Sequence, residues 1–295
     1  MTKNRITGWL LLLLLSAVWG TSYILMKKSL HAFSPIQIAA LRVATASLVL
    51  LPFAIRFLFQ LKRKQIWVLM GLGVLGNGIP AFLFAYAQTS LDSGIIGILN
   101  SLAPLFTLIV AVLFFRFKTK LINVMGVVLG LCAAIGLIYA GSSGFFLKNL
   151  GYGSLIIFAT LLYSINSNIL KKMLDDIRPL AVTSLTLFGV GLAGFVVLFS
   201  TDFIVRMETV EGAWECLGYS STLGIVGTSV AMILYNRMLK DNTALFASTV
   251  TYLIPIFALM WGFLDGERLN ALQMIMAAMV LGAVALVNFK RKENL

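Results

Sequence analysis

Apolar stretches of about twenty residues fill most of this 295-residue chain, and this pattern restricts the possible folds more than any other feature. A helix of about 20 apolar residues crosses the hydrocarbon core of a bilayer. Only short connections separate the stretches, so no soluble domain fits between them. The ten stretches are Gly8–Met26, Ile36–Phe59, Ile66–Tyr86, Gly94–Phe115, Leu121–Ala140, Gly151–Leu170, Leu180–Phe199, Ala213–Tyr235, Ala244–Phe263 and Leu269–Phe289. The sequence therefore predicts an all-α polytopic membrane protein with ten transmembrane helices.

The composition argues against other classes of protein. Hydrophobic residues make up 60% of the chain and charged residues 12%, whereas soluble domains are about 45–50% apolar and about 25% charged. The net charge is +12, but the basic residues stand in short groups between apolar stretches, so no nucleic-acid partner is expected. Cys132 and Cys216 lie far apart and the single histidine, His31, falls in a connection. We therefore expect no metal and no other cofactor.

The basic residues are distributed unevenly between the two sides of such a bundle. With the N-terminus in the cytoplasm, seventeen Lys and Arg residues belong to cytoplasmic segments and five belong to outside segments, among them Lys27, Lys28 and Arg206. Arg42 alone remains within a span. Because Lys and Arg near membrane helices are retained in the cytoplasm, we expect a multi-pass protein of the inner membrane with both termini cytoplasmic.

The two halves of the chain match each other, which predicts two five-helix repeats, residues 1–146 and 147–295. A shift of 151 positions pairs Gly73 with Gly224, Gly76 with Gly227 and Pro104 with Pro255. Near the start of each half the shift is 144, and it pairs Trp19 with Tyr163 and Lys27-Lys28 with Lys171-Lys172. Since five is an odd number of spans, the second repeat must enter the membrane in the opposite orientation. Inverted repeats of this kind build many secondary transporters.

Short motifs follow one another in a characteristic order along the chain. They are Trp19-Gly20 with Lys27-Lys28, Arg42 after Pro35, Asn100-Ser101-Leu102-Ala103-Pro104-Leu105-Phe106, Tyr252-Leu253-Ile254-Pro255-Ile256-Phe257 and Gly266-Glu267-Arg268-Leu269. With this set the chain resembles the EamA-type ten-helix carriers of the drug/metabolite transporter superfamily. The resemblance implies a carrier, since members export or exchange amino acids, nucleotide sugars, phosphorylated metabolites or toxic cations. One position departs from the pattern: the family often has an acidic residue after the fourth helix, where this chain has Arg116, whereas the second half keeps Glu267.

Interrupted spans indicate where a substrate would bind. The third span contains four glycines, Asn77 and Pro80, and the eighth contains Gly224, Gly227 and Thr228. Paired interruptions in corresponding spans are typical of a binding site near the membrane midplane, although glycines also allow helices to pack closely. The candidate substrate-binding residues are Trp19, Arg42, Asn77, Tyr86, Asn100, Tyr163, Asn166, Tyr235 and Tyr252.

Two prolines, Pro104 and Pro255, stand at matching positions in the fourth and ninth spans. Proline removes a backbone hydrogen bond and frees a carbonyl one turn earlier. Each proline can therefore mark a plain kink, or a hinge beside a polar cavity. We expect the second, with the two prolines as paired hinges for alternating access.

Arg42 is the most informative single residue. A charged side chain at the centre of a membrane helix costs roughly 2.5–3.5 kcal/mol on insertion scales and therefore usually faces the interior of the bundle. The alternative is that it extends toward the outer interface. An Arg without a carboxylate partner favours an anionic ligand, so the sequence predicts export or exchange of an amino acid or a similar carboxylate.

Other functions stay open at this stage. An exporter of cationic drugs is the nearest alternative, and a channel or an intramembrane enzyme would be of a different class. No nucleophile–base pattern such as Gly-x-Ser-x-Gly is present, so we expect no enzyme. The expected partners are a small-molecule substrate and the lipid bilayer, and a monomer is compatible with the sequence.

Overall fold

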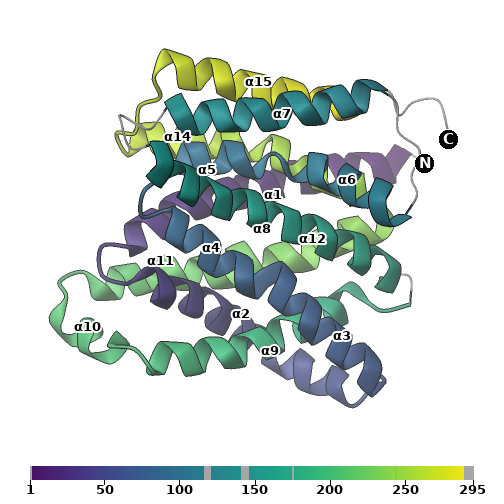
Figure 1. Cartoon of the computed structure of the whole chain (residues 1–295). Coiled ribbons are helices and arrows are strands. Elements are labelled where there is room, and N and C mark those ends of the chain that lie inside the picture. The colour runs from purple at the N-terminus through teal and green to yellow at the C-terminus, as the bar shows by residue number, and fades with distance from the viewer. Residues whose placement is uncertain (1, 116–120, 141–145, 175, 243, 289–295) are drawn as a thin grey trace.

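The structure is a computed structural model that describes residues 2–115, 121–140, 146–174, 176–242 and 244–288. Throughout these ranges the chain forms helices and no strand. Figure 1 shows the long helices side by side, with α1 beginning and α15 ending at the same end of the bundle. Because a helix satisfies its backbone hydrogen bonds within one segment, it is the solution open to an apolar chain in lipid.

The described elements fall into two groups, each with five successive helical segments. The first group is α1 (Thr2–Ser29), α2 (Pro35–Leu58), α3 (Arg63–Gly73) with the π-helix η1 (Val74–Gly78) and α4 (Ile79–Ala87), α5 (Ser93–Asn100) with α6 (Ala103–Phe115), and α7 (Leu121–Ala140). The second group is α8 (Phe146–Met173), α9 (Pro179–Phe199), α11 (Ala213–Gly224) with the π-helix η2 (Ile225–Val230) and α12 (Ala231–Asp241), α13 (Ala244–Ser248) with the 3₁₀-helix η3 (Thr249–Tyr252) and α14 (Ile254–Leu264), and α15 (Ala271–Asn288). A short helix, α10 (Phe203–Thr209), joins α9 to α11.

Length and composition of these helices fit a membrane protein. Within the described residues, nine helices are long and apolar enough to cross a bilayer, and Ala271–Leu286 is a further, shorter apolar helix. The count of ten spans therefore stays a prediction. Large apolar side chains cover the outside of the bundle: Leu113, Val196 and Phe263 are each at least 70% exposed. Such a surface suits lipid and would be a liability in water.

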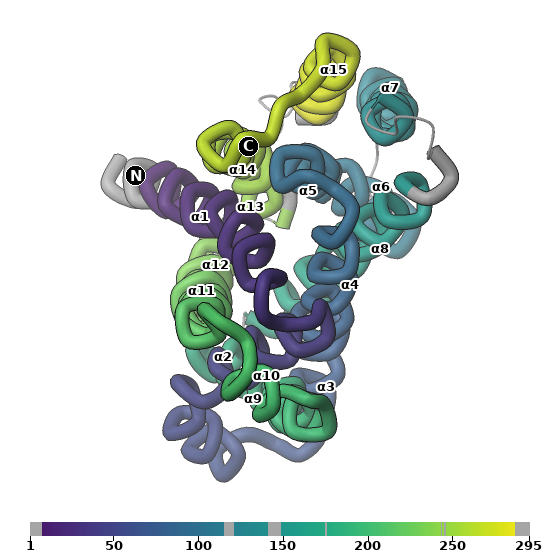
Figure 2. Tube along the Cα trace, turned by 90° about the vertical axis from the view of Figure 1, so that its left-hand side faces the viewer, coloured from purple at the N-terminus to yellow at the C-terminus, as the bar shows by residue number. Residues whose placement is uncertain are grey.

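Corresponding helices of the two groups run antiparallel, as inverted repeats require. Along α2 and α9, Gln37 donates a 2.8 Å hydrogen bond to Asp202 at one end, while Ser47 packs against Gly191 further along. The side chain of Asn270, just before α15, donates to the carbonyl of Ala140 at the end of α7 over 2.7 Å. Figures 1 and 2 show α7 and α15 lying side by side, as a pair at one edge of the molecule.

Two glycines fix the approach of the third and eighth spans to the second span of the other repeat. A Cβ on Gly73 would lie 1.8 Å from the carbonyl oxygen of Thr186, and a Cβ on Gly224 would lie 2.6 Å from that of Arg42. Thr186 and Arg42 are themselves equivalent under the shift of 144 positions. The same close contact is therefore made twice, once by each repeat, and it holds these helices around the space between the repeats.

The third and eighth spans are continuous, so the expectation that they are broken is wrong. Each instead contains a π-helical turn, Val74–Gly78 and Ile225–Val230, at equivalent positions. A π-turn inserts one extra residue, which widens the helix without ending it, and such turns are frequent at functional sites. The glycines thus loosen the helix locally, while the backbone groups remain bonded within it.

The fourth and ninth spans, by contrast, are divided into two helices. The helix α5 ends at Asn100 and α6 begins at Ala103, so that Pro104 is in the first turn of α6. Pro255 has the same place in α14. At the first turn of a helix the missing N–H of proline costs little. Each proline therefore begins a new helix rather than kinking a continuous one, and its role as a hinge stays a prediction.

Candidate functional site

A polar cavity lies between the two repeats. The space that the centres of water-sized molecules can occupy in it is about 90 Å³. Both π-turns and the ends of α5 and η3 reach it, together with α1, α2, α4, α6, α8, α12 and α13. Its lining residues are Trp19, Ser22, Tyr23, Met26, Arg42, Gly76, Asn77, Phe84, Asn100, Ala103, Thr107, Tyr163, Ser164, Asn166, Ser167, Gly227, Thr228, Met232, Tyr235, Ser248 and Thr251. The described lining thus contains one cation and no carboxylate.

Equivalent positions of the two repeats face each other across this cavity. The shift of 144 positions pairs three lining residues of α1 with three of α8, and the shift of 151 pairs residues of the later spans. The lining pairs are Trp19 with Tyr163, Ser22 with Asn166, Tyr23 with Ser167, Gly76 with Gly227, Asn77 with Thr228, Phe84 with Tyr235 and Asn100 with Thr251. The cavity therefore lies on the pseudo-two-fold axis, where secondary transporters bind their substrates.

Arg42 supplies the only charge in the described lining. Its Nε donates a 2.9 Å hydrogen bond to the hydroxyl of Thr228 in η2. Among the described residues no carboxylate forms an ion pair with Arg42. The side chain therefore faces the cavity rather than the membrane interface. A guanidinium that is held by a hydroxyl alone keeps N–H groups available for an anionic ligand.

Two amide oxygens in the same cavity have no hydrogen-bond partner in the part of the chain that the structure describes. They are the Oδ1 atoms of Asn100, at the end of α5, and of Asn166, in α8. The residues are 6% and 4% exposed. A buried acceptor without a donor costs about 1–3 kcal/mol, so both oxygens are suited to accept hydrogen bonds from a ligand.

The π-turn η2 also positions the aromatic side chains of the site. The carbonyl of Gly227 accepts a 2.9 Å hydrogen bond from the indole N–H of Trp19. The Trp19 ring lies 5.4 Å from that of Tyr235, whose hydroxyl is 3.0 Å from the hydroxyl of Ser167. At this part of the cavity the aromatic rings are thus fixed by hydrogen bonds from their polar ends, which leaves their faces to line the space.

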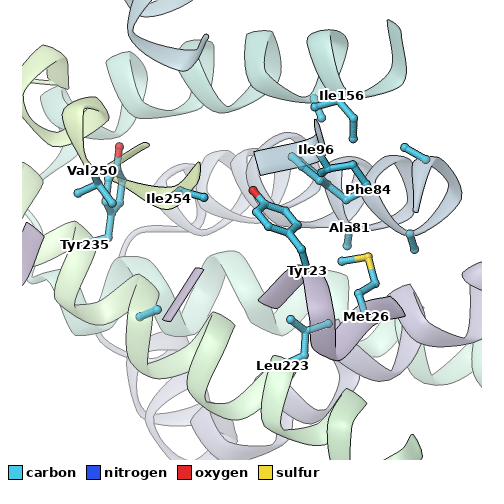
Figure 3. Packing of buried hydrophobic residues seen from close by; sticks show 14 of the residues in the cluster. Tyr23, Met26, Ala81, Phe84, Ile96, Ile156, Leu223, Tyr235, Val250 and Ile254 are labelled. Carbon is cyan, nitrogen blue, oxygen red and sulfur yellow. The ribbon is translucent and has the colours of Figure 1, made fainter. Parts of the chain in front are cut away.

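A second aromatic group closes the other side of the cavity. The ring of Phe84 stacks at 5.9 Å on Tyr23 and at 5.9 Å on Tyr163. Figure 3 shows Tyr23, Met26 and Phe84 close together, with Tyr235 apart from them at the left of the view. Tyr23, Met26 and Phe84 are 5%, 1% and 3% exposed. Solvent therefore does not reach the cavity past these three residues.

The structure brings together seven of the nine residues that the sequence suggested: Trp19, Arg42, Asn77, Asn100, Tyr163, Asn166 and Tyr235. The other two lie elsewhere. Tyr86 is 50% exposed, because it is two residues after Phe84 and so points to the opposite side of α4. Tyr252 donates its hydroxyl to the carbonyl of Val284 over 3.1 Å and so points toward α15.

Sequence reasoning missed several hydroxyl-bearing residues of the lining, among them Ser22, Tyr23 and Ser167. Ser22 and Tyr23 follow Trp19 at three and four positions, and Asn166 and Ser167 follow Tyr163 in the same way. Residues at these spacings share one face of a helix. Helical periodicity applied to Trp19 and Tyr163 would therefore have found them.

An inverted-repeat bundle of apolar helices around a polar cavity is the architecture of a membrane transporter. The model of the EamA-like transporter family matches residues 6–139 and, a second time, residues 151–289. The chain belongs to this family. Its place in the drug/metabolite transporter superfamily, which the motifs predicted, is thereby confirmed.

Relatives along the whole chain are described as transporters. An uncharacterised transporter of Archaeoglobus fulgidus is 26% identical over 96% of this chain and 99% of its own. The uncharacterised inner membrane transporter YedA of Escherichia coli is 24% identical, over 92% and 87%. A protein of Salmonella typhimurium named a probable amino-acid metabolite efflux pump is 21% identical, over 95% and 94%. One crystal structure covers 100% of both chains with a TM-score of 0.65 and 15% identity, a likeness that shows the fold alone.

Proposed function

We propose that this transporter exports or exchanges a small carboxylate-bearing metabolite, best an amino acid, by alternating access across the cytoplasmic membrane. The observation that carries the proposal is Arg42, a guanidinium in the cavity that is bonded to a hydroxyl and to no described carboxylate. The fork of N–H groups on an arginine matches the two oxygens of a carboxylate. Removed from water, such a charge-assisted hydrogen bond is about twice as strong as a neutral one.

The rest of the lining suits the other parts of an amino acid. The unpartnered oxygens of Asn100 and Asn166 are acceptors for an ammonium group. The rings of Trp19, Tyr23 and Phe84 give apolar surface for an uncharged side chain. The relative in Salmonella typhimurium that is named a probable amino-acid metabolite efflux pump supports the same class of substrate.

The proposed orientation places the bundle end that carries Lys27 outside the cell and the end that carries Lys171 in the cytoplasm. The excess of Lys and Arg in the cytoplasmic segments supports it. The Lys171 end is also where α1 begins and α15 ends (Figure 1), so both termini are cytoplasmic in this proposal. A relative described as an inner membrane transporter supports the membrane.

A cationic substrate is the second candidate. The amide oxygens of Asn100 and Asn166 and the aromatic rings favour it, because both bind cations. It would, however, have to enter beside Arg42 without a described carboxylate to offset the charge. An amino acid would use Arg42 for its carboxylate and the asparagine oxygens for its ammonium group. The carboxylate-bearing substrate is therefore preferred.

The test is counterflow transport by purified protein in proteoliposomes, screened first with amino acids. We expect Arg42→Gln to lower affinity for the identified amino acid by about 10-fold to 100-fold, the cost of a hydrogen bond to a charged group. Arg42→Lys keeps the positive charge and loses the planar fork of N–H groups. Its affinity for the amino acid should lie between those of the unmodified protein and of Arg42→Gln. The amount of protein reconstituted is matched for every variant. Unchanged affinity in Arg42→Gln would exclude carboxylate recognition by this residue, and faster uptake of organic cations would favour the second candidate.

A further inference from the structure

A cluster of charged groups ties the two repeats together at one end of the bundle, above the closed side of the cavity. The ammonium group of Lys27, in the last turn of α1, lies 2.8 Å from a carboxylate oxygen of Asp265 and 2.8 Å from one of Glu267. Lys28 lies 3.9 Å from Asp265. Lys27 belongs to the first repeat and both carboxylates belong to the second. The contact therefore crosses the boundary between the units that alternating access would move.

Glu267 also binds the beginning of a cavity helix. The backbone N–H groups of Ser93 and Gly94, the first residues of α5, donate to its two carboxylate oxygens over 3.1 and 3.3 Å. A carboxylate at a helix N-terminus is stabilised by the unpaired N–H groups and by the helix dipole. Since α5 ends at Asn100, which lines the cavity, Glu267 connects the end of the bundle to the cavity wall.

The local sequence explains how Glu267 reaches this position. Gly266 has a φ of +86°, a left-handed conformation that turns the chain back after α14. The carboxylate of Glu267 then lies over Gly262, where any side chain would occupy its place. Glu267 is thereby 7% exposed at its side chain, compared with 34% for Lys27. The carboxylate is largely removed from solvent, which strengthens its hydrogen bonds.

At the opposite end of the bundle, the counterpart of Lys27 makes a different contact. Lys171 donates to the carbonyls of Leu239 and Lys240 in the last turn of α12, over 3.0 and 2.7 Å. Both of these acceptors belong to the same repeat as Lys171. In the sequence, the position equivalent to Glu267 is Arg116, a residue of the opposite charge. The contact of Lys27 with carboxylates of the other repeat is therefore not repeated by Lys171.

We infer that Lys27 and Glu267 form a gate that holds the cavity closed at the Lys27 end, and that this transporter rests in the conformation closed there. The inference rests on alternating access as proposed above. Both residues are positioning residues: neither is part of the cavity lining, and they act through α1 and α5. The substrate would have to supply, through its contacts with Arg42 and the asparagines, the free energy that separates this pair.

Accessibility of the cavity from each side tests the gate without any substrate. In a background of Cys132→Ser and Cys216→Ala, a single cysteine replaces Ala103, a lining residue that is 5% exposed. A membrane-impermeant thiol reagent is applied to intact cells and, separately, to inside-out vesicles. We expect Glu267→Gln and Lys27→Met each to raise the labelling rate from the Lys27 side by about 10-fold or more, the cost of a charged hydrogen bond. Labelling from the Lys171 side should fall at the same time.

Two control variants separate a gate from general loosening. Arg206→Gln removes another ion pair at the same end, the 2.8 Å contact with Asp202, together with a 3.1 Å hydrogen bond to the carbonyl of Ala32 in the first repeat, and neither contact involves α5. Lys171→Met removes the counterpart lysine. Neither should raise labelling from the Lys27 side. The inference is overturned if labelling is unchanged in both gate variants, if it rises from both sides, or if Arg206→Gln gives the same rise.

The outcome is independent of the substrate. Labelling reports the resting conformation, so a transport result for Arg42→Gln that contradicts the proposed cargo leaves the gate intact, and the reverse also holds. If Glu267→Gln does not reach the membrane, Lys27→Met carries the test, because it keeps Glu267 on the N-terminus of α5.

Discussion

The two repeats build matching walls of the cavity and give them different chemistry. Trp19 and Tyr163, or Asn77 and Thr228, are similar residues in equivalent places. Arg42, however, corresponds to Thr186, which is 1% exposed and donates its hydroxyl to the carbonyl of Thr183. The shared geometry is what a rocking motion between repeats needs. The single charge breaks the symmetry and gives a bound anion one preferred orientation.

The difference between Arg42 and Thr186 affects how a substrate would bind during the transport cycle. A carboxylate on Arg42 would bind to one repeat's second span and to the other repeat's π-turn, since Arg42 is hydrogen-bonded to Thr228. The equivalent pair, Thr186 and Asn77, offers no charge. A substrate thus meets the same shape from either side but only one anion site.

The largest effect is expected where the symmetric scaffold itself is broken. Gly73→Ala would place a Cβ 1.8 Å from the carbonyl oxygen of Thr186, a backbone atom that cannot rotate away. Gly224→Ala would do the same against Thr45 and Arg42. We expect each variant to lose about 1–3 kcal/mol of stability or more, measured as a lower melting temperature in detergent and reduced abundance.

The matched controls are Gly71→Ala in α3 and Gly218→Ala in α11, where a Cβ would meet nothing within 4 Å. Alanine is the better helix former by about 1 kcal/mol, so these variants should be neutral or slightly stabilising. Equal losses at all four glycines would show that the pairing of spans across the repeats does not depend on close contact.

The fold was largely predictable because its causes are local. Twenty apolar residues require a helix in lipid wherever they occur, and an odd repeat requires inversion. Details of the backbone were not predictable from the sequence. Glycines at 73–78 suggested a break but produced a π-turn, whereas Pro104, expected in the middle of a span as a hinge, begins a helix. The choice depends on the neighbours that receive the freed backbone groups, and single-sequence patterns do not contain them.

The candidate site was predictable where residues are costly in lipid. Arg42, Asn77, Asn100 and Asn166 all line the cavity, since a polar side chain on an apolar helix must turn inward. Tyrosine carries no such cost, because its ring suits lipid or protein equally. Tyr86 and Tyr252 accordingly lie outside the cavity lining. The gate at Lys27 was invisible for another reason: its partner, Glu267, is 240 positions away in the chain.

A smaller effect is expected from the acceptors, one in each repeat. Asn100→Ala and Asn166→Ala each remove an oxygen that has no hydrogen-bond partner among the described residues. If these oxygens bind the ammonium group of an amino acid, each variant should weaken its binding several-fold, on the order of 1 kcal/mol. The affinity for the analogue without the amino group should be unchanged. Both are measured by thermal stabilisation of the purified protein.

Asn168→Ala is the control for this comparison, because Asn168 donates to the carbonyl of Ser164 in its own helix and does not line the cavity. A loss that is the same for the amino acid and its deaminated analogue would assign Asn100 and Asn166 to packing. A loss in one variant only would show that the repeats contribute unequally here as well.

The smallest effects concern two aspartates at the Lys27 end, one from each repeat, whose pKa values move in opposite directions. Burial, and then the carboxylate of Glu267, raise the pKa of Asp92 above its ordinary value of 3.8. Its carboxylate makes no cap bond to α5, whose first N–H groups are bonded to Glu267. Arg206, over 2.8 Å, lowers the pKa of Asp202, and Gln37 assists.

The signs of the two effects on stability follow from these shifts. Because the folded state binds a proton to Asp92 more readily than the unfolded chain does, ionised Asp92 destabilises the fold at neutral pH. Asp92→Asn should therefore raise the melting temperature there, and its advantage should shrink as the pH falls through the raised pKa toward 3.8.

Asp202 stabilises the fold above its unfolded pKa, and this contribution is lost as the pH falls through the lowered folded pKa. Asp202→Asn should thus lower the melting temperature at neutral pH. Melting curves of both variants between neutral pH and pH about 4, near the ordinary pKa of Asp, decide the matter: shifts of the same sign would mean that the carboxylate cluster around Glu267 does not act on Asp92.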